Sequence, residues 1–123
     1  MDHSRTPITG IVLCLTVAGF MPLPEAEGGD LAKGKSVYME VCKSCHGIDG
    51  RGAGTVKLNP PPADLTNSAV QGKLDAGLFK SIHDGRKNTA MGAWKHALSD
   101  EEIRDVIAYV RTLGGGATAL PKP

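Results

Sequence analysis

The stretch Cys42-Lys43-Ser44-Cys45-His46 determines how this 123-residue chain is best interpreted. In a Cys-x-x-Cys-His pattern, the two thiols can add to the two vinyl groups of one haem, and the histidine can bind its iron as an axial ligand. The spacing matters because about one turn of chain presents both sulfurs to one haem edge and brings the imidazole beneath the metal. The motif therefore predicts a haem attached through Cys42 and Cys45, with His46 on the iron.

Two other kinds of site use a Cys-x-x-Cys pair. A structural zinc site needs four ligands, and the third cysteine, Cys14, lies far upstream in an apolar segment. The histidines His46, His83 and His96 offer further zinc ligands, but at irregular spacing. A thioredoxin-like redox pair follows a strand, and no alternating apolar pattern precedes Cys42. Haem attachment is therefore the preferred interpretation of the motif.

Residues 1–28 have the character of an export signal. A weakly basic start is followed by a mostly apolar run over residues 8–23, which is shorter than the ~20 residues of a membrane-spanning helix. Ala26 and Gly28 are small residues in the arrangement that signal peptidase prefers. We expect cleavage after Gly28, with cleavage after Ala26 as a close alternative. Retention of the segment as a short membrane anchor is the other hypothesis.

The clearest helix signal in the sequence follows Ser99. Ser99 and Glu102 have the spacing of a capping box, and apolar residues then recur at helical spacing up to the glycines at 114–116. The apolar stripe consists of Ile103, Val106, Ile107, Val110 and Leu113. This last helix is therefore expected to bury one face against the rest of the domain.

A first helix is expected to start with Asp30 as its N-cap and to run to about residue 39 or 42. Gly34 and Tyr38 fall on one face of this helix. A glycine inside a helix costs about 1 kcal/mol relative to alanine. Gly34 therefore predicts that the last helix crosses the first in close contact, with Tyr109 beside the crossing.

A middle helix is expected over roughly residues 75–84, ended by Gly85 and with Leu74, Leu78, Phe79 and Ile82 turned inward. Before it, residues 47–64 contain several glycines and the run Pro60-Pro61-Pro62. This is a long loop for a compact domain, and such loops are usually functional. Because no strand pattern is found, the predicted fold class is all-α, with loops wrapped around the haem.

These features together resemble the class I cytochrome c family, especially its small bacterial members. The resemblance covers residues 30–114 and rests on the haem motif, Gly34 and Tyr38 before it, the proline-containing loop, a methionine in a loop and a final helix with Tyr109. It implies a cytochrome c fold, with three main helices and long loops around one covalently attached haem c.

The resemblance also implies how the chain is organised and where it works. The expected parts are a signal peptide or uncleaved anchor over residues 1–28, a cytochrome domain over 29–114 and a flexible tail over 115–123. In the family, haem is attached outside the bacterial cytoplasm, which agrees with an export signal. We therefore expect a periplasmic protein, either diffusible or anchored by its N-terminal segment.

The resemblance places the second axial ligand in the loop between the middle and last helices. Met91 lies there, and a thioether raises the reduction potential relative to a second histidine. His96 is the alternative ligand, and a gap-filling core methionine is the alternative role for Met91. Trp94 is expected to pack against the haem with its indole N–H toward a propionate, or simply to fill the core. One of the prolines 60–62 is expected to offer its carbonyl to the proximal imidazole, and the sequence does not choose among them.

The implied function is single-electron transfer, with no catalysis by this chain. One hypothesis is a periplasmic carrier between a donor complex and an oxidase, reductase or dehydrogenase. The alternatives are a haem subunit of a larger membrane or dehydrogenase complex and a ligand-reactive haem protein with a displaceable methionine. The sequence has no basic run, aromatic platform or phosphate loop, so nucleic acid is not an expected partner.

Basic residues gather on the segments that flank Met91, although the formal net charge of the chain is only +1 at pH 7. They are Lys73, Lys80, Arg86, Lys87 and Lys95. A basic rim around the haem would steer acidic redox partners toward it. An ordinary solvated surface of mixed charge explains the same residues equally well.

Overall fold

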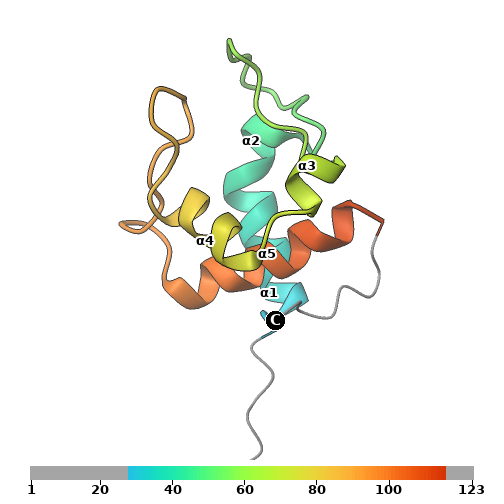
Figure 1. Ribbon diagram of the computed structural model, residues 1–123, viewed down its shortest axis with the longest axis vertical. Coiled ribbons are helices and arrows are strands. Elements are labelled where there is room, and N and C mark those ends of the chain that lie inside the picture. Colours follow the sequence, from blue (N-terminus) through green and yellow to red (C-terminus); the bar gives the residue numbers. More distant parts are fainter. Residues whose placement is uncertain (1–27, 116–123) are drawn as a thin grey trace, which may run out of the picture.

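The computed structural model describes residues 28–115, and over this range every regular element is a helix (Figure 1). The elements are α1 (Leu31–Val37), a π-helical segment η1 (Tyr38–Cys42), α2 (Lys43–His46), α3 (Ser68–Gln71), α4 (Asp75–His83) and α5 (Asp100–Leu113). The predicted all-α class is confirmed. Residues 1–27 of the predicted signal and 116–123 of the predicted tail lie outside the described residues.

The first three elements follow one another without a break and form one helical arm over residues 31–46. The arm starts beside α5 and carries the Cys-x-x-Cys-His motif at its far end (Figure 1). In this view α3 and α4 lie on either side of the arm, and α5 runs across its base. The motif therefore lies at the end of the arm away from α5, near the long loops at the top of the view.

The start of the arm follows the sequence prediction closely. Asp30 is the N-cap, and its side chain accepts hydrogen bonds from the backbone N–H groups of Ala32 at 2.8 Å and Lys33 at 3.1 Å. Gly34 is buried where α1 meets α5. A Cβ atom on Gly34 would lie inside the contact distance of the Asp105 carbonyl group. The predicted close crossing is thus confirmed, and it requires a glycine at this position.

Helix α5 is the longest element, and its inner face organises the core. Ser99 accepts a hydrogen bond from the N–H of Glu102, whose carboxylate accepts one from the N–H of Ser99 at 2.8 Å, so the predicted capping box is confirmed. Fully burying one aliphatic side chain contributes about 1.5–3 kcal/mol. The buried core residues form two groups, Val70, Leu78, Ile103 and Ile107 in one and Tyr38, Val106 and Val110 in the other.

Helix α4 matches the predicted middle helix, with one error in its apolar face. The helix ends before Gly85, which has a φ of +72° that favours glycine. Leu78 is buried, and Phe79 and Ile82 are half-buried, as expected. Leu74 was expected to turn inward but is 62% exposed. It is the extended N-cap residue of α4, so helical periodicity does not apply to it.

The single-turn helix α3 was not expected from the sequence. Asn67 caps it by accepting a hydrogen bond from the N–H of Val70 at 2.9 Å. Val70 is buried in the core. Gln71 then donates to the carbonyl groups of Leu65 at 2.7 Å and Val110 at 3.0 Å. The segment is therefore fixed against α5, although one turn is too short to give a periodic pattern.

Candidate haem site

A cavity of about 380 Å³ lies between the helical arm, the proline-containing loop and the segments on either side of α4. This volume falls within the usual range for sites that bind cofactors and small molecules. Most of its lining is apolar, with contributions from α3, α4 and α5. All five residues predicted to hold or contact haem line this cavity, namely Cys42, Cys45, His46, Met91 and Trp94.

His46, at the end of α2, is oriented by a backbone carbonyl group. Its Nδ1 atom lies 3.1 Å from the carbonyl oxygen of Ala63. Because that oxygen only accepts, Nδ1 carries the proton and Nε2 keeps a free lone pair. Burial lowers the pKa of His46, with the Ala63 hydrogen bond acting in the opposite direction. The ring is therefore held as the neutral tautomer that a metal requires.

The prediction that one of the prolines 60–62 would offer this carbonyl is wrong. The acceptor is Ala63, the residue that directly follows the run. The three prolines instead line the wall of the cavity. The loop therefore has two separate roles, because the prolines shape the cavity and the next residue orients the imidazole.

The two cysteines of the motif are half-buried at the cavity. Burial raises the pKa of the Cys42 thiol to about 11, with a smaller contribution from nearby Cys45. Redox-active pairs usually have a lowered thiol pKa, so a thioredoxin-like role is disfavoured. Within residues 28–115 no three His, Cys, Asp or Glu side chains are grouped closely enough to hold a metal ion. The zinc alternative therefore has no ligand set in this part of the chain.

Tyr38 joins the arm to the turn that follows the motif. Its side chain is fully buried, and its hydroxyl donates to the carbonyl of Gly47 at 2.7 Å. Burial raises the pKa of Tyr38 well above its usual range, so the phenol remains a neutral donor. The ring centroids of Tyr38 and Tyr109 are 5.2 Å apart, which confirms the expected place of Tyr109. The residue after His46 is thereby fixed to the middle of the arm.

Met91 and Trp94 come from the loop between α4 and α5. Backbone hydrogen bonds shape this loop, from Arg86 N–H to the Met91 carbonyl at 2.8 Å and from Trp94 N–H to the Ile82 carbonyl at 3.0 Å. Both Met91 and Trp94 are half-buried and line the cavity. His96 is exposed and is not among the lining residues. The geometry therefore favours Met91 over His96 as the ligand that this loop supplies.

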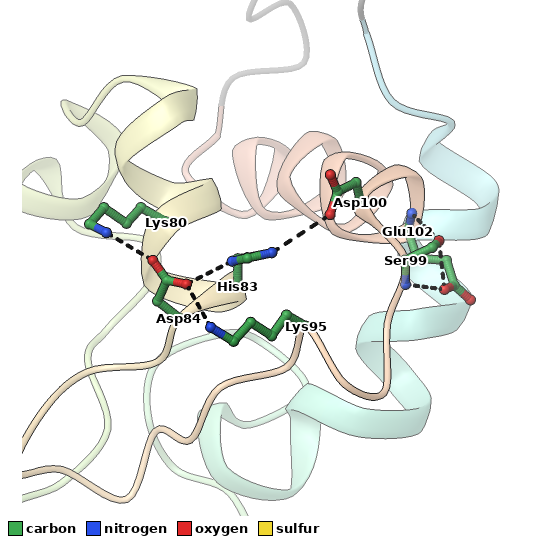
Figure 2. Close-up of polar contacts among 7 residues, drawn as sticks. All are labelled: Lys80, His83, Asp84, Lys95, Ser99, Asp100 and Glu102. Atoms are coloured by element: carbon green, nitrogen blue, oxygen red, sulfur yellow. Dashed lines mark hydrogen bonds and ion pairs between the residues drawn. The ribbon is translucent and has the colours of Figure 1, made fainter.

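Asp84, just after α4, ties this loop back to the helix (Figure 2). Its carboxylate accepts hydrogen bonds from Lys80 at 2.8 Å, His83 at 2.8 Å and Lys95 at 3.4 Å. These contacts, with that from Lys80 the strongest, hold the pKa of Asp84 well below its usual range. Lys95 follows Met91 in the chain, whereas Lys80 and His83 precede it. Asp84 therefore connects the two ends of the segment that carries the methionine. No pattern in the sequence predicts this role.

The predicted basic rim is divided between two environments. Lys80 and Lys95 form ion pairs with Asp84, which reduces the positive charge that they present to a partner. Lys73 and Arg86 line the cavity itself. These four residues therefore do not form one free basic surface.

A sequence profile described as "Cytochrome C oxidase, cbb3-type, subunit III" matches residues 29–110. The chain belongs to this family of c-type cytochromes. Haem c is therefore its covalently bound cofactor, and electron transfer is the general function of the family. The cavity fits this group, because it offers two thiols at the required spacing, a neutral imidazole with a free Nε2, a thioether and apolar walls.

The cytochrome is similar both to parts of larger proteins and to small cytochromes. It is 38% identical over 94 residues to the cbb3-type cytochrome c oxidase subunit CcoP of Azospirillum sp. (strain B510), covering 74% of this chain and 31% of that subunit. It is 40% identical over 86 residues to cytochrome c6 of Bryopsis maxima, covering 68% of this chain and 91% of that protein. The chain spans about a third of the length of the oxidase subunits that it matches.

A solved structure with the same fold is that of cytochrome cL from Methylophaga aminisulfidivorans MPT. The two share 29% sequence identity with a TM-score of 0.54, over 67% of this chain and 53% of that one. Together with the helical architecture, this likeness confirms the expected cytochrome c fold. Over residues 28–115 the cytochrome has no helix that is both long and apolar enough to cross a membrane.

Proposed function

We propose that this cytochrome is a monohaem electron-transfer protein in which Cys42 and Cys45 hold the haem and His46 and Met91 are its axial ligands. The observation that carries the proposal is that these four side chains, from α2 and its flank and from the loop before α5, line a single cavity. When bound, the haem supplies one-electron chemistry between Fe(II) and Fe(III).

The residues around the cavity keep the site unchanged while an electron passes. Ala63 holds the imidazole of His46 in one tautomer and orientation, and Asp84 restrains the loop that carries Met91. The apolar walls exclude water, and Trp94 and Tyr38 are the aromatic side chains among them. With both axial positions taken by protein ligands, no position is left for a substrate. We therefore expect no catalysis by this chain alone.

We place the protein in the periplasm, as a carrier between a donor complex and an oxidase, reductase or dehydrogenase. The predicted export signal supports this location, and the match over most of a small cytochrome c6 supports a diffusible carrier. The alternative is a haem subunit of a larger respiratory complex, supported by the match to a part of CcoP. Osmotic-shock fractionation separates the two, because a protein that stays with membranes in high salt is not diffusible.

The axial assignment is tested by comparing Met91→Ala with Met39→Ala. Met39 is the other methionine among the described residues. It lies in η1 and packs against the core group of Tyr38, Val106 and Val110, and it does not line the cavity. Loss of a thioether ligand lowers the reduction potential, so Met91→Ala is expected to lower it and to change the haem absorption spectrum. Met39→Ala is expected to keep both. An unchanged potential and spectrum in Met91→Ala would remove Met91 from the iron.

A further inference from the structure

Asp105 on α5 has a buried carboxylate of which only one oxygen is used. The residue is 3% exposed. Its Oδ1 atom accepts a hydrogen bond from the backbone N–H of Asp30 at 2.6 Å. Its Oδ2 atom is buried and has no hydrogen-bond partner among the described residues. A buried carboxylate oxygen without a donor costs free energy, so the fold has a place for a donor at this point.

The nearest charged side chains are already engaged. The charge of Asp105 makes a small contribution to raising the pKa of Lys33. The ammonium group of Lys33, however, pairs with Glu101 at 3.3 Å, and its side chain is 62% exposed. The carboxylate of Asp30 caps α1 and has no proton to donate. Neither group donates a hydrogen bond to Oδ2. The backbone that leads into α1 is close to the carboxylate, because the N–H of Asp30 already binds Oδ1.

Gly29 brings that backbone against α5. A Cβ atom on Gly29 would lie 2.6 Å from the Cα atom of Asp105 and would overlap the carbonyl of Arg104. Glycine is therefore required for this approach. The nitrogen of Gly29 is one residue away from the N–H group that already binds Oδ1. Gly28 differs, because a Cβ atom there would meet nothing within 4 Å.

We propose that Oδ2 of Asp105 is the binding site for the α-ammonium group of Gly29, formed when the predicted export signal is cleaved after Gly28. In that step a peptidase adds water across the Gly28–Gly29 peptide bond. Gly28 leaves with the new carboxylate, and the amine of Gly29 takes up a proton. The proposal rests on the predicted export signal and not on the axial ligands of the haem.

The new terminus suits Oδ2 better than the peptide group that it replaces. An ammonium group has three donors and a positive charge, so its hydrogen bond to a carboxylate is charge-assisted. A terminal glycine also turns freely about its Cα–C bond, which lets the nitrogen reach the oxygen. A positive charge beside the N-terminus of α1 is otherwise unfavourable because of the helix dipole. Pairing with Asp105 offsets that repulsion.

The proposal also decides between the two predicted cleavage sites. Cleavage after Ala26 would leave Glu27 and Gly28 in place, so the nitrogen of Gly29 would remain a neutral amide. Oδ2 of Asp105 would then stay without a partner. Only cleavage after Gly28 places the charged terminus directly beside the buried carboxylate.

The first test is the intact mass of the haem-loaded protein, exported from the full-length sequence in a bacterial host. A mature chain that starts at Gly29 is expected. The second test is a pH titration of the Gly29 amine in the same material, followed by NMR with glycine labelled with ¹⁵N. An adjacent carboxylate is expected to raise the pKa of this amine by about 1 or more above the ordinary value of about 7.7–8.0.

Asp105→Asn and Asp100→Asn form the matched pair of variants. Both remove a carboxylate from α5, but Asp100 is exposed at the start of the helix. Asp105→Asn is expected to return the pKa of the Gly29 amine toward its ordinary value, and Asp100→Asn is expected to leave it raised. The wild-type titration needs no substitution, so it tests the contact between Gly29 and Asp105 even if Asp105→Asn fails to fold. A different first residue, or an ordinary amine pKa in the wild type, would overturn the proposal.

Discussion

Replacing Gly34 with alanine tests the crossing of α1 and α5, on which the position of the haem motif depends. The new Cβ atom would overlap the carbonyl of Asp105 and lie 3.1 Å from the backbone nitrogen of Val106. Both are backbone groups of α5, so no side chain can move aside and the helices must separate. Overpacking of this kind costs about 1–3 kcal/mol, and contact with backbone belongs at the upper end of that range.

Part of this cost is returned, because alanine favours a helix over glycine by about 1 kcal/mol. The expected net loss for Gly34→Ala is therefore about 2 kcal/mol in the free energy of unfolding. In a domain of this size, 1 kcal/mol corresponds to about 4–8 °C in Tm, so we expect a Tm lower by about 8–16 °C. Thermal and guanidinium unfolding of the haem-loaded protein, followed by circular dichroism, measures both quantities.

Gly77→Ala is the matched control. Gly77 lies inside α4, and a Cβ atom there would meet nothing within 4 Å. The same substitution should therefore stabilise the protein by about 0.5–1 kcal/mol. If Gly34→Ala leaves the Tm unchanged or raises it as Gly77→Ala does, the close crossing of α1 and α5 is refuted.

Further predictions concern two polar contacts near the haem site. Tyr38→Phe removes the donor to the buried Gly47 carbonyl and should lower the free energy of unfolding by about 1–2 kcal/mol, measured by guanidinium titration. Tyr109→Phe is its control, and an equal loss in both would contradict the role given to the Gly47 contact. The contacts of Asp84 lower its pKa in the folded state, so its stabilising contribution is present above its ordinary value of about 3.9 and is lost as the pH falls below that value. Asp84→Asn should therefore flatten the decline of stability below about pH 4, and an unaltered slope there would show that Asp84 adds nothing.

The parts of the fold that the sequence predicts are those with a local chemical signature. The capping box at Ser99 and the N-cap at Asp30 depend on residues within one turn of each other, so their spacing is visible in the sequence. Gly34 was informative for a different reason. A glycine is costly inside a helix, and its presence there indicates that something else compensates.

The parts that the sequence does not predict depend on contacts between distant segments. The choice of Ala63 over the three prolines follows from the path of the loop around His46. The contact of Asp84 with Lys95 joins residues on both sides of Met91. The unpaired oxygen of Asp105 becomes visible only once α5 is packed on the start of the arm. Residue type and spacing carry no information on any of these three.

In the proposed site, His46 and Met91 together close the iron to other ligands. Titration of the reduced wild-type protein with carbon monoxide at neutral pH tests it most directly. If both ligands are in place, the absorption spectrum should remain unchanged as the gas is added. Rapid binding of one carbon monoxide per haem would contradict the claim and would favour the ligand-reactive alternative.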